Sequence, residues 1–327
     1  ARAEAVPQES GGHVAEDARE REQGANEDPL TQQQREARKA ADAPGDAPVP
    51  EPNELDLYGS LRVRYRSEHA SHGFSDGGSR LGLEGRYQLL PHKWLFARAE
   101  AGFNLLDELD ALLNPNASNP DGGRGDTFFR RLLYVGYESP DLFLVFGKAW
   151  SVYYKVSGFT DRFAGTGGKA AGTYNAGTDG GYTGTGRAEN ALQTRLLVDF
   201  LPESWGIEPF SLNIQFQDGE PIPGIDGQRY GHALGLSALF ATRDHFSLGL
   251  AYNHARVRDP DRAALRGKGI HGNAQALSLG ARWFDDDWYL ATLVARLLNH
   301  ETTDQGNYFD GWGWELYAQY RIRGRWW

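Results

Sequence analysis

Arginine recurs at every second position near the start of the patterned part of this 327-residue chain. From Leu61 to Arg66 every odd residue is apolar and every even residue is Arg. In an extended strand alternate side chains share one face, so Arg62, Arg64 and Arg66 would present their guanidinium groups together.

Side chains suited to covalent or metal chemistry are few and scattered. The nearest Ser/His pairing is His69-Ala70-Ser71, which lies in a Gly/Ser-rich segment with nothing nearby to orient the imidazole. The absence of Cys excludes thiol enzymes, disulfide scaffolds and Cys-ligated zinc. The segment Asp121–Asp126 lacks the spacing of a calcium loop. We therefore expect no enzyme activity, no metal and no cofactor.

Composition excludes a helical membrane protein and favours an exported one. The mean hydropathy is −0.58, and no apolar run approaches the ~20 residues of a membrane helix. Short alternating segments with 12% aromatic residues and 41 Gly suit a barrel, whose strands need only one lipid-facing residue in two. The absence of Met and an Ala at position 1 indicate a mature chain whose signal peptide has been removed. No run of like charge indicates nucleic acid as a partner.

From Leu55 onward the hydrophobic pattern has the period of two that is typical of strands. Apolar and polar residues alternate in the segments 80–89, 95–104, 192–196, 210–217 and 315–322. Two-sheet sandwiches alternate in the same way, so the period alone leaves the architecture open.

Connection lengths favour a barrel. Short links fall near residues 90–92, 139–141, 202–209, 241–243 and 285–287, and long polar links lie between them at 67–79, 106–126, 150–187, 218–230, 258–273 and 299–313. Short periplasmic turns that alternate with long external loops are the signature of a bacterial outer-membrane barrel. We predict an all-β transmembrane antiparallel β-barrel over residues 54–327, with about twelve visible strands.

The longest link, residues 150–187, is hereafter called the inner loop. It is rich in Gly and Thr, yet Tyr153, Tyr154, Phe159 and Phe163 argue for packing, because a solvated linker has little use for aromatic residues. Between barrel strands, a folded segment of this size has one obvious place to pack, the barrel lumen. We predict that the inner loop narrows a pore.

Residues 1–53 differ in character from the rest of the chain. They contain no aromatic residue and end in a Pro-rich stretch from Pro44 to Pro52. Such a segment buries too little apolar surface to offset its ordering entropy, although Thr31–Ala41 could form a brief helix capped by Thr31. We predict a disordered or partly helical periplasmic extension.

Several segments in register resemble the general diffusion porins of Gram-negative outer membranes, which are usually trimers of sixteen-stranded barrels with the third external loop folded inward. The matching segments are Leu55–Gly59, Ser79–Gly85, Arg131–Gly136, Phe146–Lys148, Phe159–Asp161, Gly167–Gly168 and Gly186–Arg187. The resemblance covers residues 55–325 or so. It implies an outer-membrane homotrimer, in contact with lipid and lipopolysaccharide, that passes ions and small hydrophilic solutes.

The resemblance also implies a constriction at which arginines on the barrel wall face acids on the inward loop. Arg80, Arg131 and Arg187 match the wall cluster, and Asp161 matches a loop acid. Water in the pore and a facing carboxylate would keep clustered guanidinium groups solvated and ordered.

This chain departs from the family pattern in two places. Ser60 stands where many relatives have a Lys on the first strand, and Ala164-Gly165 stands where a second loop acid follows a Pro. Lys155 and Lys169 make the inner loop more basic than usual. These changes argue against the cation preference of many relatives.

The assigned strand phases predict a lumen lining beyond the constriction. The predicted cations are Arg62, Arg64, Arg66, Arg80, Arg86, Arg98, Arg131, Arg187, Arg195, Arg282, Arg296 and Arg321, and the predicted acids are Asp56, Glu84, Glu100, Glu189, Asp199, Glu315, Asp161 and Asp179. We therefore expect a modest anion preference despite the net charge of −10. The remaining acids lie mainly in the extension and external loops, where a Debye length of ~8 Å screens them from the constriction.

The sequence leaves two alternative functions and the position of the last strand open. It does not distinguish a substrate-selective porin from a general one, and a barrel of about twelve strands also resembles outer-membrane phospholipases. Trp327 is out of phase with the lipid-facing residues of Leu316–Ile322, and Arg323–Arg325 resembles a periplasmic turn. On the family strand count, we expect roughly four further strands beyond this sequence.

Overall fold

A computed structural model describes residues 53–68, 71–103, 128–140, 142–162, 168–198, 201–202, 205–258 and 260–321, without the side chains of residues 66–68 and 71–75. These residues belong to one compact unit, Val49–Trp327. The predicted extension, except for Asn53, lies outside the described residues. So do Phe163 and the expected C-terminal turn, Arg323–Arg325.

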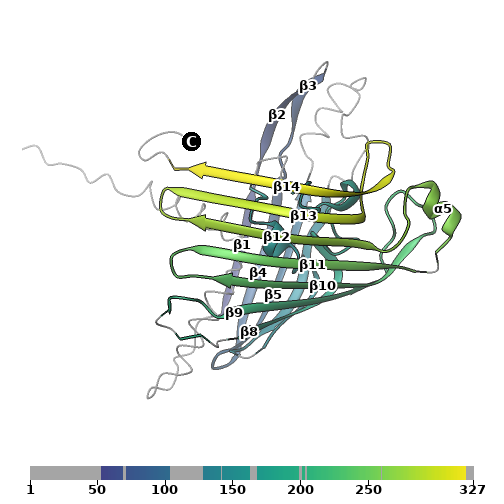
Figure 1. Ribbon diagram of the computed structural model, residues 1–327. Helices are drawn as coiled ribbons and strands as arrows, with labels where there is room; N and C mark the ends of the chain where they lie inside the picture. Colours follow the sequence, from purple (N-terminus) through teal and green to yellow (C-terminus); the bar gives the residue numbers. More distant parts are fainter. Residues whose placement is uncertain are drawn as a thin grey trace, which may run out of the picture. The chain divides into compact units, whose positions relative to one another are not determined.

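Twelve strands form one antiparallel sheet (Figure 1). In order across the sheet they are β1 (Glu54–Ser60), β4 (Arg80–Leu90), β5 (Lys93–Phe103), β6 (Phe128–Glu138), β7 (Phe143–Trp150), β8 (Arg187–Val198), β9 (Phe210–Asp218), β10 (Arg229–Ala241), β11 (Phe246–Arg258), β12 (Ala274–Phe284), β13 (Trp288–Thr302) and β14 (Tyr308–Tyr320). The predicted all-β antiparallel architecture of about twelve strands is confirmed. Among the described residues, no helix has the length and apolar character needed to cross a membrane.

Side chains alternate between two faces of the sheet, as the sequence period predicts. In β9, Gln215 is fully buried whereas its neighbour Phe216 is 48% exposed. The buried face carries the inner loop and is called the inner face; the other, the outer face, is lined by exposed residues such as Leu250, Leu279 and Val294. Because the apolar side chains point outward, the usual arrangement of a soluble protein is inverted.

Short and long connections alternate as predicted, with one exception. The expected long link at 299–313 is wrong, because β13 runs to Thr302 and β14 begins at Tyr308. The two strands resume pairing after a register shift, with Glu301 opposite Phe309. Asn299, at a φ of 48°, lies within this irregularity. Backbone pairing thus extends into residues 299–313, although this segment is as polar as a typical loop.

Leu61–Arg66, the segment with arginine at every second position, does not continue the first strand of the main sheet. β1 ends at Ser60, and Val63–Glu68 (β2) pairs instead with Ser71–Asp76 (β3) in a separate two-stranded sheet. Between the two sheets, the backbone N–H of Arg62 donates to Ser79 Oγ at 2.9 Å. The Arg62 N–H therefore bonds to a side chain, and not to a backbone carbonyl of a neighbouring strand, at the point where the chain leaves the main sheet.

The described part of the inner loop packs against the inner face, as its aromatic residues predict. It contains a one-turn helix, α4 (Tyr154–Ser157), and a 3-10 turn, η1 (Asn175–Gly177). A buried cluster joins the loop to β11, β12 and β13; its members are Tyr153, Val156, Ala171, Ala251, Ala276, Leu293, Ala295 and Leu297. Small side chains on the wall leave room for the loop, since a Cβ at Gly249 would lie 2.7 Å from Val156.

Amide side chains of the wall also hold the loop backbone. Gln215 Nε2 donates to Gly184 O at 2.9 Å, and Asn253 Nδ2 donates to the same carbonyl at 3.2 Å. Gln217 Nε2 donates to Gly181 O at 2.6 Å. Buried amides and carbonyls of this kind are costly without partners, so these bonds fix the loop at a defined height on the wall.

Candidate functional site

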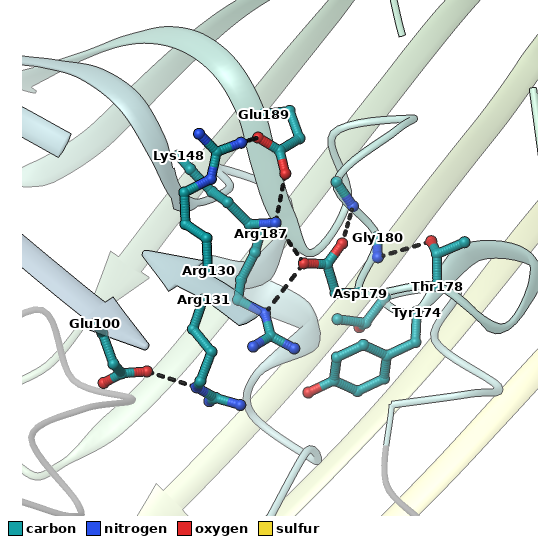
Figure 2. Close-up of polar contacts among 12 residues, drawn as sticks. Glu100, Arg130, Arg131, Lys148, Tyr174, Thr178, Asp179, Gly180, Arg187 and Glu189 are labelled. Carbon is teal, nitrogen blue, oxygen red and sulfur yellow. Dashed lines mark hydrogen bonds and ion pairs between the residues drawn. The ribbon is translucent and has the colours of Figure 1, made fainter. Parts of the chain in front are cut away.

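Two consecutive arginines of β6 reach the inner face, because the β5–β6 register shifts between Glu100 and Ala101. An extra residue in one strand of a pair re-aims side chains in this way. Arg131 Nε lies 2.6 Å from Glu100 Oε1, and Arg130 Nη2 lies 2.6 Å from Glu189 Oε2 (Figure 2). The wall therefore carries two separate Arg–carboxylate pairs.

Lys148 reaches the same region through a second irregularity. Gly147 has a φ of 128°, and a Cβ at this position would lie 2.3 Å from the carbonyl oxygen of Leu133. Only glycine adopts such a backbone conformation without strain. The Lys148 ammonium lies 2.7 Å from Asp179 Oδ2 and also forms an ion pair with Glu189 (Figure 2). Lys148 thus joins an acid of the inner loop to an acid of the wall.

Arg187, the first residue of β8, lies at the centre of this group (Figure 2). Its Nε is 3.7 Å from Asp179 Oδ2, and its guanidinium stacks over Trp150 with 5.3 Å to the ring centre. The charges of Arg187 and Arg131 repel each other, and Asp179 and Glu100 offset that repulsion. Asp179 itself is held by the backbone N–H of Gly181 at 3.0 Å.

Asp161 lies on the inner loop and accepts two tyrosine hydroxyls. Tyr174 donates to its Oδ2 at 2.6 Å and Tyr154 at 3.0 Å. Tyr154 in turn stacks on Trp150 with 3.9 Å between ring centres. Burial raises the pKa of the Asp161 carboxyl, although the two hydroxyls and the charge of Arg187 act in the opposite direction. The same burial raises the pKa values of Tyr154 and Tyr174, so both hydroxyls stay protonated donors.

The structure brings the four residues of the predicted constriction together. Arg80 and Arg131 both act on Glu100, and Arg187 interacts electrostatically with Arg131 and Asp161. Asp161, however, is bonded to tyrosines, and the loop acid that pairs with cations is Asp179.

Other predicted lumen residues divide into those in the network and those outside it. Arg98 lies 3.5 Å from both Glu84 and Glu100. Glu189 pairs with Arg130 and Lys148, as described above. Arg195 lies apart from them, over the ring of Phe143 at 4.4 Å.

Three of the predicted lumen arginines belong to the β2 segment. Arg62 and Arg64 lie beyond β1, on the two-stranded sheet or the link to it, and so not on a strand of the main sheet. Arg66 belongs to the same hairpin, but its side chain is outside the described residues. Because β1 ends at Ser60, the alternation that groups these arginines is real but belongs to another sheet.

Arg296 is wrongly assigned to the lumen. Its strand neighbours Ala295 and Leu297 are buried beneath the inner loop, so Arg296 points to the outer face. There its guanidinium lies 5.4 Å from the ring centre of Trp312, which is 73% exposed.

Sequence reasoning missed Lys148 and Arg130 as members of the charged network. Lys148 depends on a backbone irregularity, because a strict period of two continued from the buried Phe143 and Val145 assigns it no inward role. The available signal is Gly147, directly before Lys148 within a strand pattern, since an isolated glycine in a strand often marks a bulge or a close approach.

A family model described as Gram-negative porin matches residues 39–326. The chain belongs to the Gram-negative porin family. The family and the fold are those of an outer-membrane diffusion channel, and they do not favour the phospholipase-like alternative. His69 and Ala70 of the segment His69-Ala70-Ser71 lie outside the described residues.

Solved structures agree on the fold of this porin. Salmonella typhi OmpF, determined in complex with daunomycin, aligns at a TM-score of 0.61 with 21% identity, covering 83% of this chain and 75% of that one. An anion-selective porin from Comamonas acidovorans aligns at a TM-score of 0.58 with 17% identity, covering 84% of this chain and 76% of that one. No curated protein sequence matched this porin.

Proposed function

We propose that this porin forms a water-filled channel through which ions and small hydrophilic solutes diffuse passively, narrowed by the inner loop at 150–187. One observation carries the proposal: the loop is bonded to the wall through Gln215 and Gln217 on one side, while its Asp179 meets Lys148 and Arg187 on the other. A loop held at a fixed height opposite charged wall residues is the arrangement that sets pore size and ion preference.

Planar-bilayer recording of the folded protein tests this proposal directly. We expect stepwise conductance increases in salt solution, and their absence from protein with the sheet content of the structure would contradict a channel. The variants Arg131→Ala and Arg187→Ala should change single-channel conductance and ion preference. Arg243→Ala, in the exposed turn between β10 and β11, removes the same charge away from the constriction and is the matched control.

We further propose that the constriction prefers anions modestly. Around it lie the cations Arg80, Arg98, Arg130, Arg131, Lys148 and Arg187 and the acids Glu84, Glu100, Asp161, Asp179 and Glu189. The cations outnumber the acids by one, so the local field opposes the net charge of −10 of the whole chain. Reversal potentials in a salt gradient measure the preference, and a clear cation preference would contradict this assignment.

For the complete protein we propose a homotrimer in the outer membrane, in contact with lipid and lipopolysaccharide, with residues 1–53 on the periplasmic side and no catalytic activity. The family match supports the location and the channel role. Native mass spectrometry in mild detergent measures the subunit number. Protease protection in intact cells tests the side of the extension, because a periplasmic segment is cut only after the outer membrane is permeabilised.

A further inference from the structure

Near the short connections, the inner face of β12–β14 is aromatic. β12 ends at Phe284 and leads into the short link before β13. Arg282 and Phe284 are in phase with Ser278, and Tyr289 is in phase with Leu293; both reference residues are buried on the inner face. Strand pairing aligns two inward rows at this end, which are Ser247, Arg282, Ala291 and Tyr317, and then Phe284, Tyr289 and Gln319.

Two arginines stack on aromatic residues here, one from the inner loop and one from the wall. The guanidinium of Arg162, in the loop, lies 4.0 Å from the ring centre of Tyr289. The Tyr289 hydroxyl donates to Phe159 O at 2.8 Å. The guanidinium of Arg282, in β12, lies 4.8 Å from the ring centre of Phe159, and its Nε donates to Ser247 Oγ at 3.3 Å. Phe159 and Tyr289 therefore connect the two guanidinium groups.

Further rings extend this group along the wall. The rings of Phe284 and Tyr289 are stacked with 6.2 Å between their centres, and Tyr317 meets Tyr289 edge-on at 5.9 Å. The set is called the Arg–aromatic patch, and its members are Arg162, Arg282, Phe284, Tyr289 and Tyr317. Each member is half-buried, so part of each side chain stays accessible.

A comparison with β7 and β8 shows how such a stack differs when its role is packing. There the guanidinium of Arg195 lies 4.4 Å from the ring centre of Phe143, and the two residues are only 3% and 6% exposed. Side chains buried to this degree offer almost no surface to a solute. The Arg–aromatic patch differs because its rings and guanidinium groups keep accessible surface.

The patch also contains a positive charge that no acid offsets. Within the part of the chain that the structure describes, Arg162 forms no ion pair, and its Nε has no hydrogen-bond partner. Its neighbour Asp161 accepts two tyrosine hydroxyls, and Glu315 of β14 accepts donors of the loop. A partly desolvated cation without a carboxylate beside it attracts an anionic solute.

The chemistry of the patch indicates which anion fits best. A guanidinium fork donates two parallel hydrogen bonds to a carboxylate, and stacking on a ring occupies its face while leaving its N–H edge available. Aromatic rings prefer other rings as offset-stacked or edge-to-face partners, with a gain beyond that of the buried area. A solute that carries both a ring and a carboxylate satisfies both parts of the patch.

We propose that the Arg–aromatic patch is a binding subsite for small aromatic carboxylates that diffuse through the lumen. The inference rests on the proposed function, because solutes reach the inner face only if the barrel encloses a water-filled pore. Arg162 pairs with the carboxylate, and Tyr289 and Tyr317 contact the ring. The subsite is separate from the charged network of Arg131 and Arg187, which contains no member of the patch.

The experiment measures solute binding to the full chain folded in detergent, by saturation-transfer NMR with competition. The probes are benzoate, cyclohexanecarboxylate, which has the charge without the aromatic ring, and benzamide, which has the ring without the charge. We expect benzoate to bind more tightly than either. Arg162→Gln should weaken benzoate binding about tenfold, on the scale of a charge-assisted hydrogen bond, and Arg162→Lys, which keeps the charge but not the fork, should be intermediate.

Two further variants separate the ring contribution from charge in general. Tyr317→Leu leaves Arg162 and its stack on Tyr289 in place, and it should reduce the preference for benzoate over cyclohexanecarboxylate. Arg256→Gln removes one exposed charge from the outer face of β11 and should leave binding of all three probes unchanged. Equal binding of the three probes, or undiminished benzoate binding by Arg162→Gln, overturns the subsite.

Loop proteolysis and bilayer recording distinguish the remaining outcomes. If Arg162→Gln weakens all three probes equally and also speeds cleavage of the inner loop, the arginine anchors the loop and the subsite is overturned. Absence of stepwise conductance contradicts the channel, whereas binding in detergent is measured without current and still decides whether the patch recognises benzoate. Conductance without benzoate binding supports the channel and overturns the subsite.

Discussion

The two sides of the inner loop are built from different chemistry. Toward β9–β14 the loop is held by neutral amides, buried apolar contacts and two carboxylates, Glu315 and Glu301. Toward β6–β8 it meets charged side chains, with Asp179 between Lys148 and Arg187. The first side fixes where the loop lies, and the second side presents charge to the open part of the lumen. Position and ion preference are therefore separable, and variants can perturb one without the other.

The largest effect is expected where the loop touches the backbone of β14. A Cβ at Gly313 would lie 1.8 Å from the carbonyl oxygen of Ala170, so Gly313→Ala requires the loop to move. We expect a displaced loop and a roughly twofold change in single-channel conductance, because pore width at the constriction sets the current. Bilayer recording measures this change.

Gly311→Ala is the control for this prediction. It lies two residues away on the same strand, and its added Cβ would meet only the ring edge of Phe309, at 3.0 Å. Its conductance should match that of the unmodified protein. If both glycine variants conduct identically, the contact with Ala170 does not hold the loop in place.

The next effect concerns Glu315, the carboxylate on this side that accepts three hydrogen bonds from the loop. Its carboxylate accepts the Thr160 hydroxyl at 2.5 Å and the backbone N–H groups of Ala170 at 3.0 Å and Ala171 at 3.3 Å. Glu315→Ala leaves these donors without a partner, so we expect the free energy of loop anchoring to fall by about 3 kcal/mol, on the scale of hydrogen bonds to a charged group. Limited proteolysis of the inner loop should become faster.

Glu315→Gln separates hydrogen bonding from charge. The amide oxygen can still accept one or two of these bonds, so proteolysis should be intermediate between the unmodified protein and the Ala variant. Equal protection of all three proteins would show that the other contacts hold the loop without Glu315.

On the charged side, Lys148→Met tests whether ion preference can change without movement of the loop. Met has a similar length but no charge, so Asp179 and Glu189 lose their shared cation. We expect reversal potentials to shift toward cations by roughly twofold in permeability ratio, as rings of charge set which ions pass. Lys148→Arg keeps the charge and should keep the preference. A change in proteolysis comparable to that of Glu315→Ala would show that the two sides are not separable.

The same contrast explains what the sequence could predict. In β9 a polar face bonds the loop and an apolar face meets lipid, so alternation assigns Gln215 and Phe216 correctly. In β13 the inward residues are themselves apolar, because they pack under the loop. Both faces of this strand are therefore apolar, and alternation does not distinguish them. The alternation pattern therefore places Arg296 on the wrong face.

The charged network depends on features that a residue pattern does not contain. The extra residue at Arg130 and Arg131 becomes apparent only from the pairing of β5 with β6. The left-handed backbone of Gly147 turns Lys148 inward, and glycine alone does not specify which way a strand continues. The family resemblance assigns Arg131 and Arg187 to the constriction without these details, because it matches motifs rather than a strict alternation.

The smallest expected effect is the titration of Asp161, which lies on the loop between the two sides. Burial raises its pKa, so the carboxyl takes up a proton at a less acidic pH than an exposed Asp does. Its stabilising contribution is thus fully present below the unfolded pKa of ~3.9 and is lost as pH rises through the raised folded pKa. As pH falls through that value, one negative charge leaves the neighbourhood of Arg187 and anion preference should rise slightly. Reversal potentials between neutral and acidic pH should show this step, and Asp161→Asn should show the raised preference already at neutral pH and lack the step. An identical pH profile in the variant would show that Asp161 is not the group that titrates.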